Sequence, residues 1–208
     1  MTDIIHPTTT ITIPTEYLRA CFDLAPKGEF RKYLNGVYLC NTGYMQVSNG
    51  HYLAGFEIKE LTDLPESVLI PQHLLDFYLK KLQASGGNDG TYITVNYAAQ
   101  SIKLEGNKRN GTEVSEIGDM KDNYYPPVSG YMRFDIEEPE KRPMQEWLLI
   151  NWDYAALIQK AVRRINVHAH VELKMQNKQA RAWAAAVPEF KGVIAPINRN
   201  NIKEDAPV

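Results

Sequence analysis

Hydrophobic and polar positions alternate with a period of two along residues 33–54, which read YLNGVYLCNTGYMQVSNGHYLA. The alternation is interrupted at Cys40-Asn41-Thr42-Gly43 and closed at Asn49-Gly50, and both segments have the residues of tight turns. The pattern therefore predicts short antiparallel strands joined as hairpins. It contains no nucleophile, metal-ligand cluster or phosphate-binding loop, so by itself it indicates no activity.

Three other stretches have the helical period, each after a short β-like run. In residues 11–24 and 68–82 an Ile-Pro step precedes an apolar stripe on one helical face, and proline suits the first turn of a helix. In residues 148–162 Asn151 takes the place of the proline as an expected N-cap, and the stripe continues to Ile165. Each stretch predicts a strand followed by an amphipathic helix.

Strand-like runs follow each predicted helix. They cover residues 33–57 in the first set, 91–97, 100–105 and a run near Val114 in the second, and 167–175, 180–186 and 192–196 in the third. The Ile-Pro openings at Ile13 and Ile70 are 57 residues apart, a spacing typical of supersecondary repeats. The chain is therefore predicted to be an α+β protein made of three βαβββ units.

The repeats divide the chain into two parts. Residues 1–127 are expected to form a complete two-unit domain, and residues 148–208 a half domain with a polar tail. Between them, residues 128–147 hold two prolines and an acidic cluster, which predict a linker or wrapped extension with solvated charges. A lone half domain leaves a sheet edge and a helix face without a partner, so the pattern favours association between chains.

The composition is that of a soluble globular protein, with 44% hydrophobic and 23% charged residues. No apolar run is long enough for a membrane span, and the N-terminus lacks the pattern of a secretory signal, so a cytoplasmic location is expected. Cys21 and Cys40 are expected to be buried, reduced thiols. The net charge of -2 argues against binding DNA through overall charge but is compatible with a local basic face.

Candidate catalytic residues are sparse. His168-x-His170 could place two imidazoles on one face of a strand, but the spacing suggests no third metal ligand. His51 could act as a general base, yet no nucleophile or oxyanion donor accompanies it. We therefore expect no enzymatic activity, metal or cofactor, with an unrecognised hydrolase as the alternative.

The order of several motifs resembles the bacterial sliding clamp, the beta subunit of the replicative DNA polymerase. The motifs are Ile13-Pro14, Tyr33-Leu34-Asn35-Gly36, Gly50-His51-x-Leu53-Ala54, Val68-x-Ile70-Pro71, Tyr125-Pro126, Asn151-x-Asp153-Tyr154 and Val193-Ile194-Ala195-Pro196-Ile197. Residues 11–127 resemble the middle domain of that family, and residues 148–197 the second half of its last domain. The resemblance implies a DNA-clamp-like fold with antiparallel sheets outside and helices on the inner face. A shortened clamp of this kind would suit a virus or mobile element.

The resemblance also implies a ring around duplex DNA, contacted without regard to sequence through positive charge. The candidate DNA-binding residues are Lys160, Arg163, Arg164, Lys80, Lys81, Arg19, Arg31 and Lys32. For Arg19 and Lys80, each with an aspartate four residues away, an ordinary solvated pair is the favoured interpretation.

The second site implied by the resemblance is a hydrophobic groove that captures short peptides from polymerases, loaders and repair proteins. Its expected lining is Leu34, Ser48, Gly50, His51, Tyr52, Leu53, Pro126, Val193 and Ala195. Tyr52 stands where the family has arginine, Ala195 replaces a larger apolar residue, and Pro127-Val128 replaces an Asp-Tyr pair. The peptide preference is therefore open, and plain core positions are the alternative for Leu34, Leu53 and Val193.

The clamp ring contains twelve such units, and three per chain suggest a homo-oligomer of four chains joined head to tail. One alternative is a monomer whose open sheet edge is covered by residues 127–146. The other is a decoy or regulator that binds clamp partners without encircling DNA.

Overall fold

The structure is a computed structural model that describes residues 8–28, 31, 34–83, 90–107, 111–120, 150–176 and 179–195. Within these residues lie the helices α1 (Thr15–Leu24), α2 (Gln72–Gln83) and α4 (Trp152–Ile165) and the 3-10 helix η2 (Lys59–Asp63). The strands are β1 (Thr9–Ile13), β2 (Gly36–Cys40), β3 (Tyr44–Ser48), β4 (Tyr52–Glu57), β5 (Val68–Pro71), β6 (Thr91–Asn96), β7 (Ser101–Asn107), β8 (Glu113–Asp119), β9 (Glu172–Gln176), β10 (Gln179–Trp183) and β11 (Phe190–Ile194). None of the helices described is long and apolar enough to cross a membrane.

The order of the elements repeats along the chain. Unit 1 is β1-α1-β2-β3-β4, unit 2 is β5-α2-β6-β7-β8, and unit 3 is α4-β9-β10-β11. The predicted helices and hairpins are confirmed, and Asn151 caps α4 by accepting a hydrogen bond from Asp153 N at 2.9 Å. The strand expected before α4 fell on residues 148–150, of which the first two lie outside the described residues and Ile150 is not in a strand.

Units 1 and 2 exchange their first strands. β1 of unit 1 pairs with β6 in the four-stranded sheet β1-β6-β7-β8, while β5 of unit 2 pairs with β2 in the other sheet. A short strand at the start of a unit thus finds its backbone partners in the neighbouring unit rather than its own. The two units therefore complete each other and form one interlocked body.

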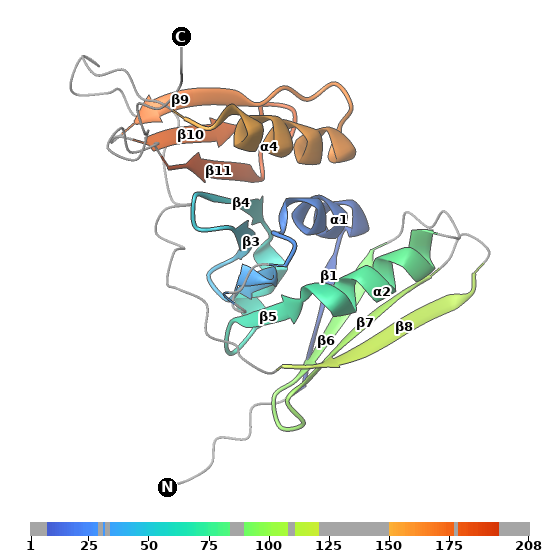
Figure 1. Ribbon diagram of the computed structural model, residues 1–208. Helices are drawn as coiled ribbons and strands as arrows, with labels where there is room; N and C mark the ends of the chain where they lie inside the picture. The colour runs from blue at the N-terminus through green and yellow to red at the C-terminus, as the bar shows by residue number, and fades with distance from the viewer. Residues whose placement is uncertain are drawn as a thin grey trace, which may run out of the picture.

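Unit 3 extends the sheet of unit 1. The seven-stranded sheet has the order β5-β2-β3-β4-β11-β10-β9, and β4 and β11 pair antiparallel with Leu53 opposite Val193. We call this β4–β11 junction the seam. The three helices lie side by side on one face of the sheets, with α1 between α4 and α2 (Figure 1). The expected α+β architecture of antiparallel sheets with helices on one face is confirmed.

A small buried hydrogen-bond network joins units 1 and 2 at the strand exchange. Thr91, the first residue of β6, bonds Thr15 Oγ1 of α1 at 2.9 Å and Tyr78 Oη of α2 at 3.0 Å through its hydroxyl. All three residues are buried, so these hydroxyls would be costly to leave unpaired. Apolar helix residues around them, such as Leu18 and Leu75, are fully buried. Burial of each such side chain contributes about 1.5–3 kcal/mol to the stability of the fold.

The third set of predicted strands is partly wrong. The run 167–175 was expected to be one strand, but β9 begins only at Glu172. Gln159 of α4 donates to Ala169 O at 2.9 Å and accepts from Val171 N at 2.8 Å, so a side chain occupies the backbone groups that a strand would use. β10 and β11 likewise end at Trp183 and Ile194, before the predicted limits.

The two cysteines are free and buried, as expected. Burial raises the pKa of the Cys21 thiol, which disfavours the reactive thiolate. The Sγ atom of Cys40 lies 2.9 Å from Thr42 Oγ1, within the turn between β2 and β3. Both residues therefore act as small apolar side chains.

Candidate functional site

Four of the residues expected to line the groove meet at the seam. Leu53 of β4 lies opposite Val193 of β11, and Ala195 N donates to His51 O at 2.7 Å. His51 and Ala195 lie just outside these two strands, and the His51 ring stacks on that of Tyr154 in α4, with the centroids 6.1 Å apart. Leu53 and Val193 are opposite each other in the ladder, so their side chains share one face of the sheet. That face is the outer one, because the neighbouring Tyr52 and Ile194 belong to the core under the helices.

The turn before β4 is held by its own side chains. Asn49 Oδ1 accepts from the backbone N–H groups of His51 and Tyr52, both at 2.9 Å. Ser48 Oγ donates to Tyr52 O at 2.7 Å and accepts from Gly50 N at 3.0 Å. Gly50 has a φ of +87°, a conformation that favours glycine. These contacts fix the position of the exposed His51 at one end of the seam.

Arg31 lies against this turn, not on the helices. Its Nη2 donates to Asn49 O at 2.8 Å, and a Cβ at Gly50 would come within 2.7 Å of Nη1. The residue was predicted to face DNA, but its charge is placed beside His51 at the end of the seam. Lys32 and Pro126, also among the predicted site residues, lie outside the described residues.

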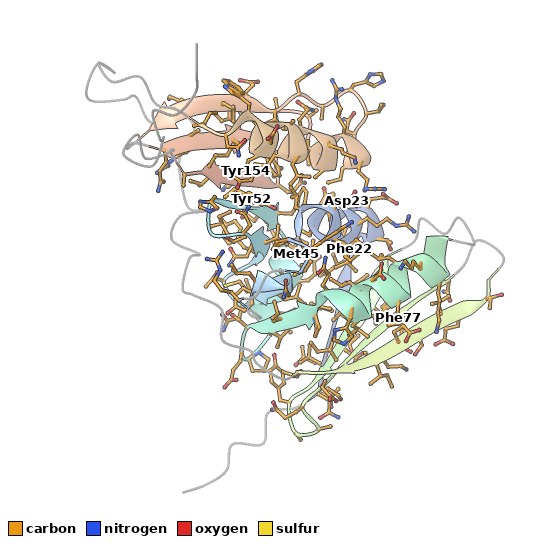
Figure 2. All side chains as sticks on the ribbon, viewed as in Figure 1. Phe22, Asp23, Met45, Tyr52, Phe77 and Tyr154 are labelled. Carbon is orange, nitrogen blue, oxygen red and sulfur yellow. The ribbon has the colours of Figure 1, made fainter. Side chains whose placement is uncertain are left out.

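Tyr52 does not line the outer face of the seam. Its hydroxyl donates to Leu24 O of α1, and its ring centroid is 5.2 Å from that of Tyr154 on α4 (Figure 2). Burial raises the pKa of Tyr52, with a smaller contribution from Tyr154. The pleat of β4 directs residue 52 to the opposite side from residue 53, so Tyr52 joins unit 1 to unit 3.

Leu34 and Leu53 are almost inaccessible, with 3% and 7% of their surface exposed. Leu34 packs with Leu69, Leu53 packs with Cys40 and Tyr44, and Tyr38 contacts both clusters. Both residues therefore serve as core on the outer side of the sheet, the alternative that the sequence left open. Gly50 and His51 are exposed and Ser48 and Ala195 are half-buried, so these four residues are the accessible part of the predicted lining among the described residues.

Gln46 is a residue of this face that sequence reasoning did not single out. It lies opposite Tyr38 on one side and Gly55 on the other, with 1% of its surface exposed. Neither atom of its amide has a hydrogen-bond partner among the described residues. A buried amide without partners is costly, and the only sequence signal was a polar residue in the middle of a strand.

The basic residues of the helices differ in how far their charge is neutralised. Lys160 and Arg163 of α4 are exposed and form no ion pair with any described residue. Arg164 pairs with Asp23 of α1, and Lys81 pairs with Glu116 of β8. The charges of Lys160 and Arg163 are thus not neutralised by any described residue and are available to a binding partner.

The remaining basic residues, Arg19 and Lys80, face acidic groups between α1 and α2. Lys80 pairs with Asp76 at 2.6 Å, as expected, and Arg19 lies 3.8 Å from Glu16. The expected pairing of Arg19 with Asp23 is wrong, because Asp23 pairs with Arg164 of α4 instead. A cavity of about 200 Å³ lies here, lined by Arg19, Phe22, Asp23, Asp76, Leu79, Lys80 and Arg164.

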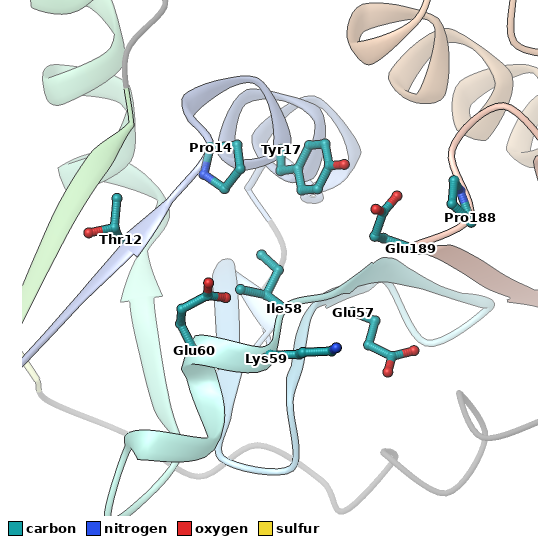
Figure 3. Close-up of a pocket in the computed structure, with 9 residues that line it drawn as sticks. All are labelled: Thr12, Pro14, Tyr17, Glu57, Ile58, Lys59, Glu60, Pro188 and Glu189. Atoms are coloured by element: carbon teal, nitrogen blue, oxygen red, sulfur yellow. The ribbon is translucent and has the colours of Figure 1, made fainter.

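A larger cavity of about 460 Å³ lies at the other end of the seam (Figure 3). It is lined by Thr12, Pro14, Tyr17, Glu57, Ile58, Lys59, Glu60, Pro188 and Glu189. Burial raises the pKa of Tyr17, and the charge and hydrogen bond of Glu189 raise it further. Three carboxylates against one lysine make this cavity unsuited to phosphate groups. No sequence pattern indicated this cavity, because its residues come from three separate segments of the chain.

No arrangement of side chains typical of a catalytic or metal site is found in the part of the chain that the structure describes. His168 and His170 are exposed in the turn and coil before β9, and no group of three potential metal ligands occurs among the described residues. The expectation that the two histidines share one face of a strand is wrong, because that strand starts after them.

Several solved structures share the fold of this chain. The DNA polymerase III subunit beta of Pseudomonas aeruginosa matches 91% of the chain with a TM-score of 0.60 and 15% sequence identity. The beta subunit of Thermotoga maritima matches 95% with a TM-score of 0.58 and 16% identity. Pol III beta of Caulobacter crescentus matches 95% with a TM-score of 0.52 and 15% identity. The chain therefore has the fold of bacterial beta sliding clamps.

The chain spans 66% to 69% of the length of these three proteins, about two thirds. No protein-family model matches the chain, and no curated protein matches it by sequence. The resemblance inferred from the motifs of the chain is thus confirmed at the level of the fold.

Proposed function

We propose that this chain is a sliding-clamp-like accessory of DNA replication or repair, without enzymatic activity, that acts in the cytoplasm. It binds short peptides of polymerase or repair proteins at the seam and contacts duplex DNA with its helices. Units 1 and 2 form a complete clamp domain and unit 3 a half domain. The observation that carries the proposal is the seam itself, which joins two segments far apart in sequence in the fold of the beta clamps.

The seam supports peptide binding through its composition. The accessible end combines the His51 imidazole, the Arg31 guanidinium and the small apolar side chain of Ala195, while the neighbouring Val193 is 5% exposed and, like Leu53, belongs to the core. Such a mixture of a few polar groups and apolar surface suits an extended peptide with an aliphatic or aromatic anchor. The small side chain at position 195 leaves room for a larger anchor than a bulkier residue would.

The test is a titration with a fluorescent clamp-binding peptide. We expect micromolar affinity, about -8 kcal/mol, and at least a fivefold loss in His51→Ala. His168→Ala is the matched control, since it removes an exposed histidine far from the seam and should bind normally. Wild-type protein that is folded but binds no such peptide would reject the assignment of the seam.

The helices support a sequence-independent contact with DNA. α4 carries Lys160, Arg163 and Arg164 against a single acidic residue, Asp153, and so presents an excess of positive charge. Electrostatic contact of this kind holds phosphates without reading bases, as a sliding contact requires.

A second candidate function has an observation in its favour. Arg164, Lys80 and Lys81 are each paired with a carboxylate, so much of the positive charge on the helices is already neutralised. A protein with an intact peptide site and weak DNA contact would act as a decoy or regulator of clamp partners. DNA association of the wild type at low salt separates the two functions, because the decoy needs none.

A further inference from the structure

Unit 3 lacks the contact that units 1 and 2 provide for each other. In unit 1 the outer side of β2 pairs with β5 from unit 2, and in unit 2 the outer side of β6 pairs with β1 from unit 1. β9 is the strand of unit 3 in the same position, directly after the helix and before the next hairpin strand. It pairs with β10 on one side, and no other described strand pairs with it on the other.

Several apolar side chains of unit 3 remain part exposed among the described residues near this edge. Leu173 of β9 points to the core side of the sheet, since it lies opposite the buried Ala182, yet it is only half-buried. The residues in the same place in units 1 and 2, Leu39 and Ile93, are fully buried. Eight apolar residues pack on the main core while remaining part exposed, and six of them belong to unit 3. Burial of such surface is the main driving force for association.

The first residues of α1 and α4 differ in the same way. Thr15 of α1 is 1% exposed, because it contacts Thr91 of the neighbouring unit. Trp152 stands at that position in α4 and is 70% exposed. A large exposed aromatic side chain, at the helix position that a neighbouring unit covers in unit 1, is a feature of interaction surfaces. Comparison with units 1 and 2 therefore indicates that a partner unit would cover the free side of β9 and Trp152 of α4.

We propose that this partner is unit 3 of a second copy of the chain, related by a two-fold axis. The exchange between units 1 and 2 is reciprocal, with each unit covering the other in the same way. Unit 3 has no described strand before α4 to exchange, but units 1 and 2 also place α1 and α2 beside each other around one small cavity. Two copies of α4 can repeat this helix contact and cover each other's half-buried apolar residues. A head-to-tail contact cannot repeat it, because α1 already lies beside α2 within each chain. In the proposed assembly this two-fold contact joins the half domains, where the sequence had suggested a head-to-tail contact.

The repeat also indicates which residues meet at the two-fold axis. Arg19 and Asp76, the fifth residues of α1 and α2, line the same small cavity between these helices. Ala156 is the fifth residue of α4 and is exposed. In the proposed dimer Ala156 therefore lies close to Ala156 of the partner subunit. The inference deepens the proposed clamp assembly but requires neither peptide nor DNA binding, so its tests are independent of those above.

Disulfide trapping of the full chain tests the two-fold contact. Ala156→Cys, mildly oxidised at about 20 μM, is expected to give a covalent dimer on a non-reducing gel. The native Cys21 and Cys40 are buried and should not contribute. Ala185→Cys, at an exposed alanine in the turn after β10, is the matched control and should remain monomeric. Equal cross-linking of both variants, or none at position 156, would overturn the proposal.

Light scattering behind a sizing column gives a second measurement. Wild-type protein is expected to elute with the mass of at least two chains, and Ala156→Arg as a species of half that mass or less. Arginine is a good helix former and the position is exposed, so the variant should keep the wild-type circular dichroism spectrum. A wild-type monomer at tens of micromolar, or an unchanged mass in folded Ala156→Arg, contradicts the two-fold contact.

Discussion

Asp23 of α1 and Arg164 of α4 form an ion pair between units 1 and 3, with Arg164 Nη2 2.5 Å and Nε 2.7 Å from Asp23 Oδ2. The two residues are 141 positions apart, so only the packing of α4 beside α1 brings them together. Both nitrogens donate to the same carboxylate oxygen; the ion pair helps align the helices and neutralises a cation on the face proposed to meet DNA.

Breaking this pair should affect DNA binding more than stability. Asp23→Asn frees the charge of Arg164, so DNA affinity at low salt should rise, and the slope of log K against log salt should steepen by about one. Both side chains are about a third exposed, so the loss in unfolding free energy should stay below about 1 kcal/mol. Fluorescence anisotropy with a labelled duplex measures the slope. Asp153→Asn, which makes the same change in net charge at the far end of α4, should change it less.

Removing the free cations of α4 should have the opposite effect. Lys160→Ala with Arg163→Ala should weaken DNA association and flatten the salt dependence by about one unit per lost phosphate contact. The control pair, Lys27→Ala with Lys59→Ala, removes two exposed lysines that are outside the three helices. If both pairs lower the affinity equally, the helix face has no special role. If the wild type does not bind DNA at all, the decoy function is favoured.

Gln46→Met should stabilise the protein. The variant keeps the length of the side chain and removes two buried polar atoms that have no partner among the described residues. The free energy of unfolding should therefore rise by about 1–2 kcal/mol. Urea unfolding should therefore show a higher midpoint with an unchanged slope. Gln159→Met is the matched control and should destabilise, because that amide bonds both Ala169 O and Val171 N. A lower midpoint for Gln46→Met would show that its amide is in fact satisfied.

Leu53→Glu should unfold or strongly destabilise the chain rather than act on peptide binding alone. Leu53 is 7% exposed and packs with Cys40 and Tyr44, so a carboxylate there would be buried without a partner. We expect a loss of at least about 2 kcal/mol in the free energy of unfolding. The same substitution at the exposed Val167 should be nearly neutral in a thermal melt. His51 is therefore the better site at which to test the groove.

Stability should fall at alkaline pH, in part through Tyr52. Burial raises its pKa in the folded state, so its contribution is fully present below the unfolded pKa of about 10 and is lost as the pH rises toward the folded value. Above pH 10 the unfolded chain releases this proton first, at about 1.4 kcal/mol per pH unit for each such group. Tyr52→Phe should lose about 1 kcal/mol at pH 7 with the bond to Leu24 O, but show a shallower decline between pH 10 and 11. An identical pH slope in the two proteins would contradict this role.

Much of the fold follows from local sequence patterns. Hairpin turns at Cys40–Gly43 and Asn49-Gly50, helix starts after Pro14 and at Asn151, and the three-fold repeat were all readable from the chain, because each depends on residues within a few positions of one another. The order of short motifs around them was enough to suggest the clamp fold. Local propensity and hydrophobic period act over such distances, so they survive without knowledge of the tertiary structure.

Other features were decided only when distant segments met. The start of β9 depends on Gln159, the side of the sheet occupied by Tyr52 depends on the register of the seam, and Asp23 takes its partner from unit 3 rather than from its own helix. The strand exchange between units 1 and 2 likewise needs two surfaces to fit. Sequence determined which elements form, because those interactions are local. Tertiary structure alone decided their partners, because backbone pairing, burial and ion pairing between segments depend on spatial proximity that no local pattern encodes.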